Sequence, residues 1–381
     1  METAIREVIE SGRFVLGPQV TELESAVASY SQTKYAIGCA SGSDAILLAL
    51  MAMGISPGDE VIVPSFTFFA TASAVWRLGA RPLFVDIDED TLNIDVTQLE
   101  SLITNQTRAI IPVHLFGQCA EMEAINEIAS RHNIKVIEDA AQSIGAEYNG
   151  QIAGGIGLAG CLSFYPTKNL GGMGDAGMIT TNDDAFADEV TLLRGHGMRP
   201  RYLHQAVGIN SRLDSMQAAI LLIKLRYLNE WSQARRQNAQ RYDRLFQAAN
   251  LGDQLKLPFE SPKCKSVWNQ YTVQVVDGRR DALREFLKGK NIGSEIYYPL
   301  PLHLQPCFAE LGVARGSLPV TERAADQVLS LPVFPHMTEA EQDYVVASVV
   351  EFFETTEKPT ATQTLRGPHF LKRQNQPAPK P

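Results

Sequence analysis

The sequence lacks the features that mark membrane, secreted and nucleic-acid-binding proteins. Its longest apolar run, residues 45–55, is too short to cross a bilayer. The first residues are charged and contain no apolar stretch of the kind found at the centre of a secretory signal peptide. The chain has a formal net charge of −9 and no basic stripe that would suit nucleic acid. We therefore expect a cytoplasmic protein with neither a membrane nor a nucleic-acid partner.

Cysteine is scarce and shows no pattern. The cysteines are odd in number, lie far apart in the sequence and include no C-x-x-C pair: Cys39, Cys119, Cys161, Cys264 and Cys307. A disulfide framework needs paired cysteines, and a structural zinc site needs closely spaced ligands. The sequence therefore predicts neither disulfides nor a metal site.

The length and composition are those of a globular protein with more than one domain. The chain has 381 residues, of which 45% are hydrophobic and 20% charged. From residue 34 to residue 139, short apolar runs alternate with helical patterns, which is typical of βαβ units and a mostly parallel sheet. We expect an α/β large domain over residues 1–245 and a smaller α+β domain over residues 246–355. Residues 356–381 are polar and proline-rich, and we expect a disordered tail.

The most informative stretch runs from residue 136 to residue 181. An apolar run ends in Glu138 and Asp139, as in a buried parallel strand that brings acids to the edge where α/β sheets bind ligands. Further along, Lys168 stands alone among small residues. Pyridoxal phosphate chemistry needs a lysine that forms a Schiff base and an acid that keeps the pyridine nitrogen protonated. On spacing alone, a helix cap and a solvated lysine explain the same residues more simply.

Two features nearer the N-terminus suit the same cofactor. A strand pattern over residues 34–39 leads through a small-residue turn into a helical run, and such a helix N-terminus offers free backbone N–H groups to an anion. A simple helix cap by Ser43 or Asp44 is the alternative, and both can hold at once. The strand of residues 60–64 is followed by three phenylalanines, one of which can stack on a flat ring while Phe66 and Phe69 join the core.

These motifs together resemble those of a known family. EDAAQS followed by SFYPTKNLGGMGDAG is similar to the DegT/StrS-type sugar-nucleotide aminotransferases, a branch of the aspartate aminotransferase fold. The resemblance extends over residues 11–353. It implies fold type I, in which a three-layer large domain surrounds a mostly parallel sheet, and pyridoxal 5'-phosphate as the cofactor. It also implies that Lys168 and Asp139 are the catalytic residues, Lys168 as the Schiff-base lysine and Asp139 as the partner of the pyridine nitrogen.

The resemblance assigns further residues to the cofactor and the substrate. Asn210, in GINSRLD, matches an asparagine that reaches the phosphate of the neighbouring subunit's cofactor, which implies a homodimer with shared active sites. We expect His114 to line the pocket. The remaining predicted cofactor contacts are Gly42, Ser43 and Ser163 at the phosphate, Phe68 stacked on the ring, and Gln142 at the ring hydroxyl. The predicted substrate contacts are Arg212, Tyr297, Tyr298 and His303.

The implied reaction moves an amino group from an amino acid, L-glutamate in the first instance, to a keto-sugar nucleotide for aminosugar biosynthesis. A cyclitol aminotransferase and a pyridoxal-phosphate-dependent dehydratase are alternatives on the same fold. Some dehydratases of this kind carry histidine in place of the lysine, so Lys168 argues against that activity. A non-catalytic regulatory protein is an alternative of another class, against which the intact Lys168 and Asp139 count.

Overall fold

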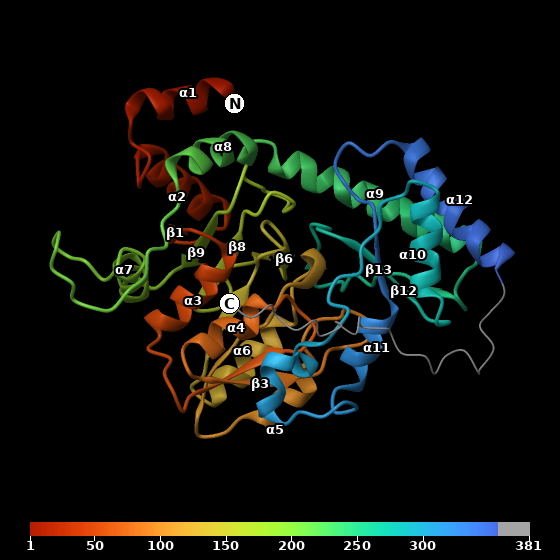
Figure 1. The fold of residues 1–381 in the computed structure, drawn as a ribbon, viewed down its shortest axis with the longest axis horizontal. Helices are drawn as coiled ribbons and strands as arrows, with labels where there is room; N and C mark the ends of the chain where they lie inside the picture. Colours follow the sequence, from red (N-terminus) through yellow and green to blue (C-terminus); the bar gives the residue numbers. More distant parts are fainter. Residues whose placement is uncertain (357–381) are drawn as a thin grey trace, which may run out of the picture.

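The computed structural model describes residues 1–356, which form a large lobe and a smaller lobe joined along the long helix α9 (Leu228–Ala249) (Figure 1). A sheet of seven strands, in the order β1-β9-β8-β5-β4-β2-β3, organises the large lobe. The neighbours from β8 to β3 run parallel, whereas β9 is antiparallel to both β8 and β1. The strands are β1 (Tyr35–Cys39), β2 (Glu60–Pro64), β3 (Arg81–Val85), β4 (Thr107–Ile110), β5 (Lys135–Asp139), β8 (Ala159–Ser163) and β9 (Gly177–Thr181). The predicted mostly parallel sheet is thus confirmed.

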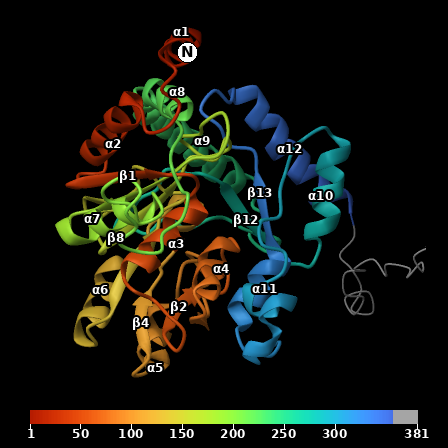
Figure 2. The same cartoon turned by 60° about the vertical axis from the view of Figure 1, so that its left-hand side comes forward.

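Helices cover both faces of this sheet (Figure 2). Because successive strand residues point to opposite faces, Val61 and Val63 of β2 pack in one cluster and Ile62 in another. The first cluster includes α3 (Gly42–Ala52), α4 (Ala70–Arg77) and α7 (Asp184–Leu193), and the second includes α5 (Leu99–Leu102) and α6 (Met122–Arg131). A further cluster packs α2 (Pro18–Tyr30) and α8 (Ser215–Leu225) on the end of the sheet, and α1 (Glu2–Ser11) lies against α8. The large lobe therefore has the predicted three layers.

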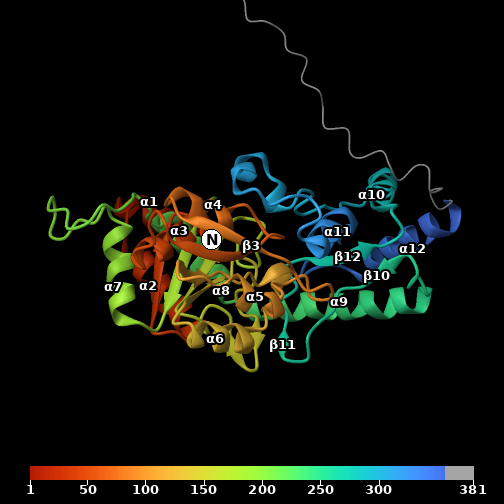
Figure 3. The same ribbon diagram turned by 90° about the horizontal axis from the view of Figure 1, so that it is seen from below.

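The small lobe is built on a second, antiparallel sheet. Its order is β10-β12-β13, with strands β10 (Leu255–Lys256), β12 (Tyr271–Val275) and β13 (Val328–Leu331). Helices α10 (Arg280–Gly289) and α12 (Glu339–Thr355) and the second half of α9 pack on it. Figure 3 shows α9 running from beneath the large lobe into the small one. A third, minor sheet contains β6 (Glu147–Tyr148), β7 (Gln151–Ile152) and β11 (Cys264–Lys265).

The packing does not follow the predicted boundary at residue 245. Tyr242 of α9 already belongs to the core of the small lobe, so α9 serves both lobes. Conversely, Leu302, Phe308 and Leu318 return to the core of the large lobe, through the 3₁₀ segments Leu302–Leu304 and Pro306–Leu311. Helix α11 (Pro319–Gln327) then leads into β13. The predicted tail lies, apart from Thr356, outside the described residues.

Over residues 1–356, none of the helices combines the length and the apolar character required to cross a membrane.

Candidate active site

Asp139 lies at the carboxyl end of β5, in the middle of the sheet, and is buried. The Thr71 hydroxyl donates to its Oδ2 at 2.7 Å, and the Ala141 N–H donates to Oδ1 at 3.3 Å. Burial raises the pKa of Asp139, while the Thr71 and Ala141 hydrogen bonds and the positive charge of Lys168 act in the opposite direction. Among residues 1–356, no cation forms an ion pair with this carboxylate. A buried carboxylate without a cation in contact suits a ligand that carries a protonated ring nitrogen.

Lys168 lies in the loop between β8 and β9, near Asp139 as predicted. Its backbone N–H donates to the Tyr165 carbonyl at 2.9 Å, which closes a turn just after β8. Burial lowers the pKa of the Lys168 ammonium, and the negative charge of Asp139 acts in the opposite direction. A lowered pKa increases the fraction of neutral amine, the form that attacks a carbonyl carbon. The side chain is therefore suited to bonding an aldehyde.

The turn between β1 and α3 is suited to a phosphate. Ser41 is the residue that caps α3, since its hydroxyl accepts from the Asp44 N–H at 3.1 Å, so the predicted cap by Ser43 or Asp44 is wrong. The N–H groups of Gly42 and Ser43 precede the helix's own hydrogen-bond ladder and are free to bind an anion. A Cβ on Gly42 would lie 2.6 Å from that of Ser163, so the two predicted phosphate contacts are adjacent.

The three phenylalanines after β2 have different surroundings. Phe66 is 1% exposed and belongs to the core, as predicted. Phe68 is 59% exposed, which leaves its ring available to a ligand. Phe69 was expected in the core, but it is 43% exposed and packs against Phe308, 5.6 Å between ring centroids. Stacking of the Phe68 ring on the cofactor stays a prediction that this exposure allows.

Gln142 is held between the two lobes. Its Oε1 accepts from the Phe116 N–H at 2.7 Å, and its Nε2 donates to the Tyr298 hydroxyl at 2.8 Å. The second hydrogen on Nε2 has no acceptor among the described residues, so Gln142 can still donate to a ring oxygen. Tyr298 stacks on Phe116 and meets Phe66 edge-on, and Tyr297 packs beside them. Both predicted tyrosines therefore lie on the Gln142 side of the site.

His303 and His114 are buried and bonded to other side chains, unlike the pocket positions predicted for them. His303 is 2% exposed: its Nδ1 lies 2.7 Å from the Ser65 hydroxyl and its Nε2 3.1 Å from Glu322. Both ring nitrogens are thus occupied, and the prediction of a substrate contact is wrong for this conformation. His114 is fully buried, 2.8 Å from Glu138, and accepts from the Ala120 N–H, so it does not line the pocket.

Asn210 and Arg212 lie on the strand-like segment before α8. Asn210 is exposed and forms an isolated bridge with Gly195, and Arg212 is half-buried. Between them, Ser211 accepts from the Ala40 N–H at 3.1 Å, which joins this segment to the turn before α3. The predicted partner-facing asparagine therefore lies beside its own subunit's anion turn, at the surface.

Sequence reasoning missed three residues that support the site. Thr71, in the first turn of α4, orients Asp139 and bonds to Thr67 in turn, at 3.2 Å between hydroxyl oxygens. Two residues of α8 bind the backbone of the loop after Lys168. The Gln217 Oε1 accepts from the Met173 N–H, and the Lys224 Nζ donates to the Gly171 carbonyl. The partners of these residues are distant in the sequence. The sequence signal for Gln217 and Lys224 is that they are polar residues in the otherwise apolar helix α8.

Several known proteins are similar to this chain over nearly its whole length. A "Pleiotropic regulatory protein" of Geobacillus stearothermophilus is 53% identical over 91% of this chain and 92% of the relative. The UDP-2-acetamido-2-deoxy-3-oxo-D-glucuronate aminotransferase of Pseudomonas aeruginosa is 44% identical, covering 92% of this chain and 95% of the relative. A dTDP-3-amino-3,4,6-trideoxy-alpha-D-glucose transaminase of Streptomyces venezuelae is 43% identical over 94% of this chain and 93% of the relative.

Solved structures are similar over the same part of the chain. The crystal structure of S. venezuelae DesV in complex with a ketimine intermediate has a TM-score of 0.89 and 42% identity, covering 93% of this chain and 95% of that one. The structure of ntda from Bacillus subtilis with bound PMP has a TM-score of 0.85 and 34% identity, covering 92% of this chain and 81% of that one. The family model for the DegT/DnrJ/EryC1/StrS aminotransferases matches residues 1–350. The fold is that of pyridoxal-phosphate-dependent aminotransferases, the surroundings of Asp139 and Lys168 suit that cofactor, and the chain belongs to the DegT/DnrJ/EryC1/StrS aminotransferase family.

Proposed function

We propose that this aminotransferase moves an amino group from L-glutamate to a keto-sugar nucleotide whose keto group is on the third ring carbon. The names of the similar P. aeruginosa and S. venezuelae enzymes support the substrate class, since both place the keto or amino group at carbon 3. A third relative, 45% identical, is a UDP-N-acetyl-3-dehydro-alpha-D-glucosamine 3-aminotransferase. We place the reaction in aminosugar biosynthesis, in the cytoplasm.

The residues of the site suit the two half-reactions. Pyridoxal phosphate, when bound, supplies a ring that withdraws electrons from the neighbouring substrate carbon. Asp139 would stay ionised against the ring nitrogen, with Thr71 holding its Oδ2. Gly42, Ser43 and Ser163 would hold the phosphate, Gln142 the ring oxygen, and Phe68 one face of the ring. Lys168 Nζ would take a proton from the substrate carbon and return it on the cofactor side, acting as base and then acid.

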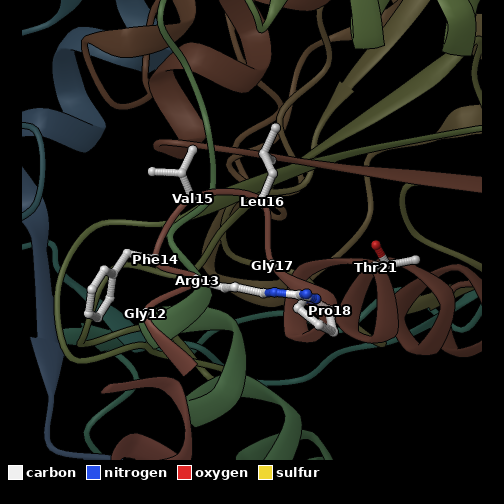
Figure 4. Close-up of a pocket in the computed structure, with 8 residues that line it drawn as sticks. All are labelled: Gly12, Arg13, Phe14, Val15, Leu16, Gly17, Pro18 and Thr21. Atoms are coloured by element: carbon white, nitrogen blue, oxygen red, sulfur yellow. The ribbon is translucent and has the colours of Figure 1, made fainter. Parts of the chain in front are cut away.

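We also propose that two copies of the chain share their active sites. The surface around Asn210 supports this arrangement, because it carries exposed apolar side chains that a monomer would leave in water. Phe14, Val15 and Leu16 are all exposed, and the chain there is tied to α8 through the Phe14 carbonyl and Ser215 N–H. They border a surface hollow of about 450 Å³ that is also lined by Arg13 and Pro18 (Figure 4). None of the predicted cofactor contacts lines this hollow, which suits a subunit interface.

A loop beside α7 adds to the same surface. Residues 196–208 project from the large lobe in the views of Figures 1 and 3. Within this loop Tyr202 is 78% exposed and Val207 93%, and the loop starts and ends at the bridge between Gly195 and Asn210. Side chains of this kind favour burial against a partner, and a two-fold axis near Asn210 would bury both copies of the loop at once.

The proposal is tested by a panel of acceptors. The purified protein, loaded with pyridoxal phosphate, is mixed with L-glutamate and a 3-keto-sugar nucleotide, a 4-keto-sugar nucleotide or a keto-cyclitol. We expect 2-oxoglutarate and the amino sugar to form with the 3-keto acceptor. Turnover with the keto-cyclitol alone would favour the cyclitol aminotransferase, and loss of water from the sugar without amination would favour the dehydratase.

The regulatory alternative is tested separately, since one relative carries that name. The absorption band of the Schiff base between the cofactor and Lys168 should disappear on borohydride treatment of the native chain and be absent from the Lys168→Ala variant. A protein that binds the cofactor through Lys168 but turns over no acceptor of the panel would favour a regulatory role.

A further inference from the structure

Asn169, the residue after Lys168, is buried and binds outside its own loop. It is 8% exposed, and its Nδ2 donates to the Val267 carbonyl at 2.9 Å. A backbone carbonyl only accepts, so the orientation of this amide is fixed. Lys168 itself makes only the backbone bond to Tyr165 among the described hydrogen bonds. The bond from Asn169 is therefore the nearest connection between Lys168 and the chain that leads into the small lobe.

Val267 belongs to a place where two chain segments cross in close contact. Residues 115–117 of the large lobe meet residues 266–270, which lead into β12; we call this contact the interdomain crossing. The Gly117 carbonyl accepts from the Val267 N–H at 3.0 Å and from the Ser266 hydroxyl at 3.0 Å. A Cβ on Gly117, whose φ is +101°, would lie 2.8 Å from the Asn269 nitrogen. Only glycine allows the two backbones to approach so closely.

The interdomain crossing also holds the other side of the cofactor site. The Phe116 carbonyl accepts from Gln270, and the Phe116 N–H donates to Gln142, which in turn binds Tyr298. Phe116, Trp268 and Tyr298 all have positive φ, at 56°, 50° and 60°. Such backbone conformations are strained in residues other than glycine and persist where the surroundings enforce them.

Arg235 of α9 fixes the crossing from the small-lobe side. Its guanidinium donates to the carbonyls of Trp268 at 3.2 Å, Asn269 at 3.4 Å and Val333 at 2.8 Å. No acid pairs with it among the described residues, and burial lowers its pKa to about 10. The carbonyl groups that Arg235 binds thus connect α9 to the interdomain crossing, and through it to the large lobe.

We propose that Asn169 is a positioning residue, whose bond to Val267 fixes Lys168 to the interdomain crossing and so sets the place of the Lys168 amine relative to Gln142 and Asp139. The same backbone crossing then positions the lysine and the ring-oxygen contact together. The inference rests on the aminotransferase activity and on the role of Lys168, and it is independent of which sugar is the acceptor.

The test compares Asn169→Ala with Asn238→Ala, which removes an exposed bond of the same type, from the Asn238 Nδ2 to the Phe334 carbonyl at 2.8 Å, outside both the Lys168 loop and residues 115–117 and 266–270. We expect Asn169→Ala to lower kcat for both half-reactions by roughly 10- to 100-fold, with little change in KM, because the amine is displaced. The pH at which the absorption of the bound cofactor changes should rise by about half a unit or more, since the lysine nitrogen gains solvent. Asn238→Ala should change neither quantity.

A second pair of variants tests the connection from its other end. Ser266→Ala loosens the crossing and leaves Asn169 in place, so it should produce a smaller change of the same sign. In the Asn169→Ala/Ser266→Ala double variant the loss of kcat should be less than the product of the single losses, because both act through Val267. Ser266→Ala also serves if Asn169→Ala does not fold.

Two outcomes overturn the proposal. One is an unchanged kcat and absorption profile in Asn169→Ala. The other is a lower melting temperature of the cofactor-free protein with an unchanged absorption profile, which would show a purely structural bond. If Lys168→Ala kept the absorption band, the role of Lys168 itself would be wrong, and the two failures are therefore distinguishable.

Discussion

Asp139 and Lys168 each carry a charge that burial opposes. Burial raises the pKa of the Asp139 carboxyl and lowers that of the Lys168 ammonium, and neither side chain has an ion-pair partner in contact within residues 1–356. Groups of this kind reduce the stability of an empty fold and are kept where the chemistry needs them. A cofactor with a positive ring nitrogen and an aldehyde satisfies both at once.

The Asp139→Asn variant separates the contribution of the carboxylate to turnover from its cost in stability. We expect turnover to fall by roughly 10²–10³-fold, the usual loss when a preorganised charged group is removed. The raised pKa means that the ionised carboxylate lowers stability at every pH above the folded-state pKa. Cofactor-free Asp139→Asn should therefore melt at a higher temperature than the cofactor-free parent at pH 7. The measurements are steady-state kinetics and thermal unfolding; unchanged turnover would assign the ring nitrogen to another acid.

Lys168→Ala should abolish transamination and the absorption band of the bound cofactor while the fold is retained. The physical reason is that, among residues 1–356, Lys168 is the lysine whose charge acts on Asp139, whereas the amine of nearby Lys224 binds the Gly171 carbonyl. Lys34→Ala, which removes an exposed lysine, is the matched control and should keep full activity. Turnover by Lys168→Ala at the rate of the control would refute the assignment.

Single residues were predictable where their role depends on neighbours in sequence. Asp139 and Lys168 lie in continuous motifs next to strands. The sequence alone was therefore sufficient to predict that both lie at the same edge of the sheet. The surroundings of His303 depend on Ser65 and Glu322, and those of His114 on Glu138 across the sheet. No local pattern encodes such pairs, which explains why both histidines were assigned to the pocket.

Helix α11 shows how an element is attached to the other lobe. Its first N–H groups, at Val320 and Thr321, donate to the buried carboxylate of Asp86 at 3.0 and 2.7 Å. Asp86 follows β3, so a side chain of the large lobe caps a helix that leads into the small one. A buried N–H that loses its acceptor costs about 1–3 kcal/mol.

Asp86→Ala should therefore lower the free energy of unfolding by about 1–3 kcal/mol and speed hydrogen exchange at Val320 and Thr321. Asp183→Ala, which removes the surface cap of α7 at Phe186, should cost about 1 kcal/mol without affecting α11. Denaturant unfolding and residue-resolved hydrogen exchange measure both effects. Unchanged exchange at α11 in Asp86→Ala would contradict the attachment.

Elements were predicted best where periodicity and length agree, as in β2, whose bounds match the predicted ones. The sequence alone predicts a helix over residues 321–329, because Val328 and Leu329 continue its apolar pattern, whereas α11 ends at Gln327. In the structure Val328 turns to extended backbone and pairs with Gln274 of β12. The partner strand lies more than fifty residues earlier, so tertiary pairing decided what local sequence could not.

At the scale of the whole molecule, the two lobes meet at the candidate cofactor site, and several exposed apolar side chains lie near the segment of Asn210. Phe14, Val15 and Leu16 adjoin α8, and the projecting loop of residues 196–208 is closed by the Gly195–Asn210 bridge. A single chain leaves this surface in water. The match of Asn210 to the family motif and the exposed surface together support our proposal that Asn210 serves the neighbouring subunit.

Mixing two inactive variants tests that prediction. A Lys168→Ala subunit and an Asn210→Ala subunit should each form impaired homodimers. In the heterodimer one site carries both substitutions, while the other combines an intact Lys168 with an intact Asn210. After full exchange, half of the dimers are mixed and each has one intact site, so activity should recover to roughly a quarter of the parent value. A mixture of Lys168→Ala with Lys168→Ala/Asn210→Ala has no intact site and is the control. Verified heterodimers that stay inactive, or a monomer that is fully active on dilution, would show that each chain completes its own site.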